Sequence, residues 1–92
     1  MNDVLTMDAD RELAAQLCAF IDSEVSLDPD TPVKPDTDLL TTGLVDSLGA
    51  MELVHFLEEH RNIDIDPVDV TIENFGTVNS MVALATRLTS TA

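Results

Sequence analysis

Apolar side chains recur along the first part of the chain at the spacing of a helix. They lie four residues apart, at Leu13, Leu17, Ile21 and Val25. This spacing places them on one face of an amphipathic helix, predicted from about residue 8 to residue 25. Asp8 or Asp10 is expected to cap its start, where an acidic side chain suits the helix dipole. Residues 1–7 lack the period, and we expect them to fray.

Residues 26–45 are predicted to form a long connection. Proline recurs at every third residue in Pro29, Pro32 and Pro35, which forbids regular helix, and Gly43 allows a sharp turn. A loop of this length in a small domain is expected to be functional or well packed. The residues expected to anchor it to the core are Leu39, Leu40, Leu44 and Val45. Its aspartates lack the glycine and terminal glutamate of an EF-hand, so calcium is not expected.

A second helix is predicted from about Ser47 to His60. At 100° per residue, one side collects Ala50, Leu53, Val54 and Leu57, which we expect to face the core. The opposite side collects Leu48, Met51, Glu52, His55 and Glu59, with Glu58 at its margin. Apolar residues set among acids are typical of a docking surface, although single exposed apolar residues are also common.

The last third of the chain predicts a short extended link that packs Ile63 and Ile65, then a helical turn from Pro67 to about Glu73. Thr77 or Asn79 is expected to cap a final helix that ends near residue 88. Its buried stripe is Val78, Met81, Val82, Ala85 and Leu88. The predicted fold is therefore all-α, a small four-helix bundle with three main helices, one short helix and a long loop between the first two. We expect a single domain over residues 1–92, with an ordered core from about 8 to 88.

Composition supports small packed helices. The 92 residues are 45% apolar, yet they include only three Phe and no Trp or Tyr. The single cysteine, Cys18, excludes an internal disulfide, and we expect it to be a small buried apolar residue rather than a reactive thiol. The sequence shows no signal peptide, long apolar run or lipidation motif, so a reducing cytoplasm is the expected location.

Charge limits the partners that the chain can bind. Four Lys and Arg against 18 Asp and Glu give a net charge of −14. Nucleic acid and anionic membranes repel such a chain, whereas proteins with basic patches attract it. The alternative is that the acidity serves only solubility.

Ser47 stands at the mouth of the second helix, where it could be a nucleophile, a modification site or a cap. Its surroundings give half of a G-x-S-x-G elbow, and His55 lies eight residues further along the helix, roughly 12 Å away. His60 is further still, and Asp46 is a weak base, so catalysis and a tiny hydrolase are not favoured. The two histidines are too isolated to indicate a metal site. Ser and Asp are both favoured caps, and a helix start also suits a phosphate ester.

The run Asp46-Ser47-Leu48, followed by Met51–Val54 and Leu57–Glu59, resembles the acyl and peptidyl carrier proteins, and the likeness covers about residues 10–88. The resemblance implies a bundle of the acyl-carrier type, in which Ser47 receives a 4′-phosphopantetheine arm from coenzyme A through a Mg²⁺-dependent phosphopantetheinyl transferase. Asp46 then serves transferase recognition or caps the helix. The arm holds acyl or aminoacyl groups as thioesters, and the carrier itself performs no chemistry.

The resemblance also implies partners. The face formed by Leu48, Met51, Glu52, His55, Glu58 and Glu59 is expected to bind enzymes with basic patches. These are the transferase, an adenylating enzyme or acyltransferase that loads the arm, and downstream synthases or transferases. We expect a free-standing monomer.

Two departures from the family pattern bear on the subclass. Gly49 follows the Asp-Ser-Leu triplet where fatty-acid carriers typically have an acidic residue, and His55 occupies a position that is often apolar. Residues 65–77 look more like carriers of polyketide, nonribosomal-peptide or D-alanyl-transfer systems. The sequence therefore favours secondary metabolism. The alternatives are a housekeeping fatty-acid carrier and an unmodified acidic interaction module.

Overall fold

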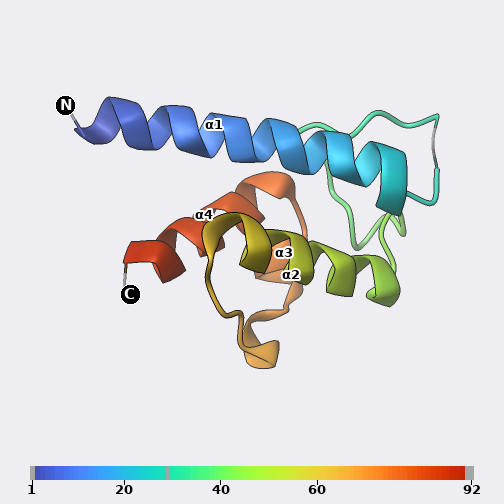
Figure 1. Cartoon of the computed structure of the whole chain (residues 1–92). Helices are drawn as coiled ribbons and strands as arrows, with labels where there is room; N and C mark the ends of the chain where they lie inside the picture. Colours follow the sequence, from blue (N-terminus) through green and yellow to red (C-terminus); the bar gives the residue numbers. More distant parts are fainter. Residues whose placement is uncertain (1, 29, 91–92) are drawn as a thin grey trace.

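The computed structural model describes residues 2–28 and 30–90 of the chain. The main helices are α1 (Asn2–Phe20), α2 (Ser47–Arg61) and α4 (Val78–Ser90), and α3 (Ile72–Phe75) is short. A π-helical turn (Ile21–Val25) continues α1, and a 3₁₀ turn (Pro67–Asp69) precedes α3. Figure 1 shows α1 running along one side of the molecule, with α2, α3 and α4 on its other side and the long loop at one end. The predicted all-helical fold, with three main helices and one short one, is confirmed.

The start of α1 differs from the prediction. The helix begins at Asn2 rather than near residue 8, so Asp8 and Asp10 lie within it and neither caps it. The apolar period reports which residues are buried, and a helix can continue beyond its buried stretch because each added residue extends an existing nucleus. Asp10 instead accepts hydrogen bonds from Arg61 at 3.2 Å and Thr86 at 3.1 Å. Its carboxylate thus joins α1 to α2 and α4.

The core contains the apolar stripes that the periodicity predicts. In α1 and the π-helical turn they are Leu13, Leu17, Ile21 and Val25, and in α2 they are Ala50, Leu53, Val54 and Leu57. In α4 they are Val78, Met81, Val82 and Ala85, with Leu88 packed at the edge. The structure adds Phe75, Leu84 and Val33, which the periodicity did not identify.

The long loop is well packed. Leu39, Leu44 and Val45 are buried as expected, and Leu40 is half-buried against the core. The backbone N–H of Leu39 donates to the carbonyl of Gly76 at 2.7 Å, which ties the loop to the segment between α3 and α4. Pro29, which contributed to the loop prediction, lies outside the described residues. The loop is therefore a fixed part of the fold where the structure describes it.

The segment between α2 and α4 differs from the predicted single turn over Pro67–Glu73. The chain forms two short helical pieces, because Val70 has non-helical angles (φ −83°, ψ 82°). Asp66 caps the first piece and Thr71 caps the second, each through its side-chain oxygen. The two caps thus divide the predicted single helical turn into two separate pieces.

The ends of the neighbouring elements follow the predictions. Ile65 is buried, and Ile63 packs against the core. Thr77, rather than Asn79, caps α4, because its hydroxyl oxygen accepts from the N–H of Ser80 at 3.1 Å. Across the part of the chain that the structure describes, none of the helices has the length and apolar character that a bilayer crossing requires.

Candidate functional site

The start of α2 is capped by Asp46. Its backbone is extended (φ −95°, ψ −173°), and its carboxylate accepts from the N–H of Gly49 at 2.8 Å. This is the geometry of an N-cap residue, so Ser47 becomes the first residue of the helix. Of the two capping candidates in the sequence, the structure selects Asp46.

The Ser47 hydroxyl therefore does not cap the helix. The residue is exposed, and within the described ranges its hydroxyl has no hydrogen-bond partner. The backbone N–H groups of a first helical turn and the positive end of the dipole favour an anion at this position. An exposed hydroxyl at a helix start is a suitable attachment point for a phosphate ester.

Gly49 allows the first turn of α2 to pack closely against the π-helical turn that continues α1. A Cβ atom at Gly49 would lie 2.7 Å from Cγ1 of Val25 and 2.9 Å from Cγ1 of Val45. Sequence reasoning noted Gly49 as part of an incomplete G-x-S-x-G elbow and as a departure from a family pattern, and it missed this contact. The available signal was a glycine in the first turn of a helix, where it weakens helix formation unless close packing requires it.

The loop reverses direction just before the site. Gly43 has a positive φ of 78°, which favours glycine, and its N–H donates to the carbonyl of Leu40 at 3.2 Å. Leu44 and Val45 then turn inward and are buried. These two side chains fix the chain immediately before Asp46, so the site stands on an anchored backbone.

The outer face of α2 carries exposed apolar and acidic side chains together. Leu48 is 76% exposed and Met51 is 51% exposed. Glu52, His55 and Glu59 are exposed beside them. The structure therefore brings these five candidate docking residues to the solvent side of α2.

Glu58 differs from the other candidates on this helix. Its side chain is 29% exposed, and one oxygen accepts from the backbone N–H of Ile65 at 3.0 Å. The other oxygen lies 3.9 Å from Nδ1 of His55. Glu58 thus holds the chain that follows α2, in addition to lying at the margin of the outer face.

An aromatic stack borders the same face. The ring centroids of Phe20 and Phe56 are 4.7 Å apart, and those of Phe56 and His60 are 4.0 Å apart. A hollow of about 260 Å³ lies between Phe20, Phe56, Glu52, His55 and Glu59. Sequence reasoning missed Phe20 here, although its place beside the buried Ile21 indicated a position at the edge of the α1 stripe.

The histidines do not form a catalytic pair with Ser47. His60 is placed by a 3.1 Å contact between Nδ1 and the carbonyl of Phe56, and the side chain of His55 lies near Glu58. No group of three or more potential metal ligands occurs among the residues described. In the part of the chain that the structure describes, the contacts of both histidines are with groups other than the Ser47 hydroxyl.

Cys18 lies away from this site, on α1. Its side chain is partly buried against the core. Burial raises the pKa of the thiol above its ordinary value, and the negative charge of Asp22 raises it further. A raised pKa leaves less of the reactive thiolate at neutral pH, in agreement with the expected packing role.

Comparison with known proteins identifies the family. Residues 11–85 match the family described as the phosphopantetheine attachment site. The chain is also 39% identical over 70 residues to the probable acyl carrier protein PigG of Serratia sp. (strain ATCC 39006), an alignment that covers 75% of this chain and 74% of that protein.

These matches agree with the geometry of the α2 start, where an exposed hydroxyl fits a phosphate ester. The family implies a covalent phosphopantetheine group, a transferase that attaches it and enzymes that load it. Members serve as carriers and do not themselves catalyse reactions. The chain belongs to the phosphopantetheine-binding carrier protein family.

Proposed function

We propose that Ser47 is the residue that carries 4′-phosphopantetheine. The observation that supports this most directly is that Asp46, and not Ser47, caps the start of α2. Asp46 supplies the cap through its bond to Gly49, so the exposed Ser47 hydroxyl has no structural task in the described part of the chain. A serine that served as the cap would have its oxygen committed to the backbone.

The chemistry requires an external enzyme. The Ser47 oxygen forms a bond to the phosphorus of the pantetheine phosphate. The bond between that phosphorus and the oxygen that bridges the two phosphates of coenzyme A breaks, and adenosine 3′,5′-bisphosphate leaves. The hydroxyl proton passes to a base of the transferase, since the contacts of His55 and His60 are with Glu58 and Phe56 rather than with Ser47. Once attached, the phosphodiester lies at the positive end of the α2 dipole.

The outer face of α2 is proposed to recognise the enzymes that use the arm. Leu48 and Met51 supply apolar contact area, and Glu52 and Glu59 supply negative charge. Within the described structure neither glutamate has an ion-pair partner. A basic patch on an enzyme would therefore meet unpaired carboxylates around an apolar centre, which favours fast and salt-sensitive association. The net charge of −14 opposes association between copies.

The pathway is proposed to be secondary metabolism of the polyketide or nonribosomal-peptide type. Support comes from the sequence of residues 65–77 and from Gly49 after the Asp-Ser-Leu triplet. The mass of the carrier isolated from its own host tests this. A polyketide or aminoacyl cargo is expected, whereas a series of even-numbered saturated acyl chains would indicate the fatty-acid role.

An intact-mass experiment tests the attachment site. The purified protein is incubated with coenzyme A, Mg²⁺ and a broad-specificity phosphopantetheinyl transferase. The expected result is a mass increase equal to one phosphopantetheine arm, lost in Ser47→Ala. Ser23→Ala removes another exposed serine hydroxyl, on the π-helical turn, and should leave the increase unchanged.

Three outcomes would contradict the assignment. An increase that persists in Ser47→Ala would place the arm elsewhere. No increase, under conditions that modify another carrier, would favour an unmodified interaction module. Hydrolysis of an activated ester by the unmodified protein, lost in Ser47→Ala, would favour a hydrolase.

A further inference from the structure

A small hollow lies between the end of α1 and the outer face of α2. Its volume is about 260 Å³, and it is lined by Phe20, Glu52, His55, Phe56 and Glu59. The four α2 residues follow the spacing i, i+3, i+4 and i+7, which places them along one stripe of the helix. Phe20 comes from α1, and its ring stacks on that of Phe56 with 4.7 Å between the centroids. Phe20 thus extends the outer face of α2 onto α1.

The permanent charges at this hollow are negative. Glu52 and Glu59 lie at the two ends of the stripe, about 10 Å apart along the helix, and neither has an ion-pair partner in the described structure. A cation between them would lie about 5 Å along the axis from each, inside the Debye length of about 8 Å at physiological ionic strength. Nδ1 of His55 lies 3.9 Å from Glu58, which offsets any positive charge on the histidine. Among the described residues, no Lys or Arg lines the hollow.

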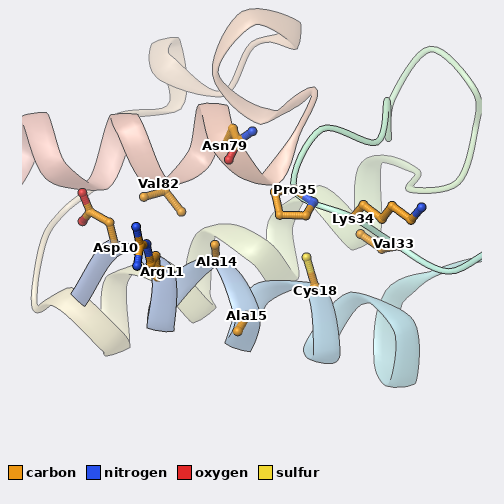
Figure 2. Close-up of a pocket in the computed structure, with 10 residues that line it drawn as sticks. All are labelled: Asp10, Arg11, Ala14, Ala15, Cys18, Val33, Lys34, Pro35, Asn79 and Val82. Carbon is orange, nitrogen blue, oxygen red and sulfur yellow. The ribbon is translucent and has the colours of Figure 1, made fainter. Parts of the chain in front are cut away.

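A larger cleft elsewhere on the molecule has no such preference of charge. It has a volume of about 620 Å³ and lies between α1, residues 33–35 of the loop and α4. Figure 2 shows Asp10 and Arg11 together at one end of it, and the Lys34 ammonium directed away from it. Because opposite charges meet at that end, the cleft favours neither an anion nor a cation. The hollow at Phe20 is smaller but has a definite sign of charge.

The size and polarity of the hollow match one amphipathic side chain. Small-molecule sites enclose about 300–1,000 Å³, so this hollow is too small for most such ligands. The rings of Phe20 and Phe56 provide an apolar floor, and Glu52 and Glu59 provide a negative rim. A purely apolar side chain would remove water from the carboxylates without replacing its hydrogen bonds, which costs free energy. A long basic side chain fits both features, because its methylene stem covers apolar surface while its charged head reaches the carboxylates.

Arginine suits this hollow better than lysine. The guanidinium group is planar and stacks on aromatic rings, and it is more weakly hydrated than an ammonium group. It therefore loses less on leaving water for a floor that Phe20 and Phe56 form.

The hollow is within reach of an enzyme that approaches Ser47. Glu52 and Glu59 are five and twelve residues beyond Ser47, which is about 8 Å and 18 Å along the helix. A standard interface covers about 800 Å² of each partner, which corresponds to a patch of about 16 Å radius. One interface of ordinary size can therefore include both Ser47 and the hollow.

We propose that the hollow binds an arginine side chain of the enzymes that act at Ser47, the phosphopantetheinyl transferase among them. The arginine stem contacts Phe20 and Phe56, and its guanidinium lies between Glu52 and Glu59. This inference rests on the function proposed for the outer face of α2 and makes it more specific. Phe20 of α1 becomes a recognition residue, and one type of partner side chain is selected rather than positive charge in general.

A chemical-shift titration of the unmodified full chain tests the contact. The probe is N-acetyl-arginine N-methylamide, added to ¹⁵N-labelled protein at constant ionic strength. The citrulline derivative is an uncharged control of nearly the same shape. The arginine probe should cause saturable shifts of the amides of Phe20 and residues 52–59, with weak affinity because one side chain makes few contacts. The citrulline probe should cause none, and the matching lysine probe should bind more weakly than arginine.

Variants locate the contact. Glu52→Gln and Glu59→Gln should each weaken arginine binding about 1.5- to five-fold, the range for exposed ion pairs. Phe20→Leu keeps an apolar side chain without the ring and should weaken it about two- to five-fold. Glu12→Gln removes an exposed charge about 12 Å before Phe20 on α1 and should leave the affinity unchanged. If Phe20→Leu does not fold, the two glutamate variants still decide the outcome.

Transferase kinetics connect the hollow to a partner. Phe20→Leu and Glu59→Gln should raise KM for the carrier about two- to five-fold with kcat nearly unchanged, because the contact forms on binding and persists through the transfer. The inference is overturned if KM is unchanged in both variants, if the citrulline or lysine probe binds as well as the arginine probe, or if Glu12→Gln weakens binding as much as Glu59→Gln.

Failure of this inference can be told apart from failure of the Ser47 assignment, because the titration uses unmodified protein. A mass increase that is lost in Ser47→Ala, without arginine binding, would overturn the role of the hollow alone. Arginine binding without any mass increase would overturn the attachment at Ser47 and leave the arginine contact standing.

Discussion

Gly49 lies so close to Val25 that a Cβ atom on the glycine would be 2.7 Å from the valine Cγ1. Val45 closes the other side at 2.9 Å. Both valines are β-branched and stiff about χ1, so neither methyl group moves away without cost. This contact sets the first turn of α2, which carries Ser47, against the π-helical turn at the end of α1.

We expect Gly49→Ala to lower the free energy of unfolding by about 1–2 kcal/mol. Overpacking costs about 1–3 kcal/mol, and the better helix propensity of alanine returns up to about 1 kcal/mol. Urea denaturation of the two proteins measures the difference. In the Val25→Ala background the same change should cost less, because the clashing methyl group is gone. A stabilised Gly49→Ala protein would show that the valines can repack.

Asp46 is predicted to have two separable roles. Asp46→Ala removes the cap and should cost about 0.5–2 kcal/mol of stability. Asp46→Asn keeps an oxygen that can accept from Gly49 and should cost less, while the negative charge is lost. The modification rate with the transferase then isolates the charge. A rate for Asp46→Asn equal to the wild type would show that Asp46 serves only as a cap.

Glu52 and Glu58 are predicted to respond differently to substitution. Glu58→Ala deprives the N–H of Ile65 of its acceptor and should cost about 1–3 kcal/mol in urea denaturation. Glu52→Ala should change stability by less than about 0.5 kcal/mol, because the residue is exposed and unpaired. Equal losses would mean that the bond to Ile65 contributes little.

The docking role is tested on Glu52, because this residue is exposed and its substitution is expected to leave the fold intact. Glu52→Lys should lower kcat/KM of the transferase and flatten its dependence on NaCl concentration. Glu12→Lys makes the same charge change at an exposed position of α1 and serves as the control. If both variants slow the transferase equally, it responds to total charge rather than to the outer face of α2.

Cys18 is predicted to react slowly with iodoacetamide at neutral pH. Burial and then the charge of Asp22 raise the pKa of its thiol, so the thiolate fraction at a given pH is smaller than that of an ordinary cysteine. Alkylation should therefore accelerate only at more alkaline pH than for a free thiol, as followed by mass spectrometry. Asp22→Asn should move this acceleration to lower pH. A rate equal to that of free cysteine at neutral pH would contradict the prediction.

The three main helices could be predicted because periodicity reports burial. Leu13, Leu17, Ile21 and Val25 had to share a face, and that face is in the core. The first residues of α1 are helical without such a stripe, which periodicity cannot detect. Val33 is buried in an irregular part of the loop, where its N–H donates to the carboxylate of Asp22 at 3.1 Å, and it belongs to no repeating pattern.

The site was only partly accessible to sequence reasoning. Asp46 and Ser47 are both favoured N-cap residues. Which of them caps the helix depends on backbone angles that the amino-acid sequence does not specify. Glu58 lies at the margin of the outer face by its helical angle. Its bond to Ile65 arises only because the chain turns back after α2, at Asn62, whose φ is 52°. Predicting this contact requires the three-dimensional path of the chain.

The bond between Asp10 and Arg61 has a consequence for the opposite end of α2. Arg61 is the last residue of that helix, and Gly49 lies in its first turn. The helix is therefore held near both of its ends, by an ion pair with α1 at one end and by close packing against the π-helical turn that continues α1 at the other. Sliding along its axis or rotation about it would break one of these attachments. If Ser47 carries the arm, as proposed, each enzyme would thus meet its hydroxyl at the same height and angle relative to α1.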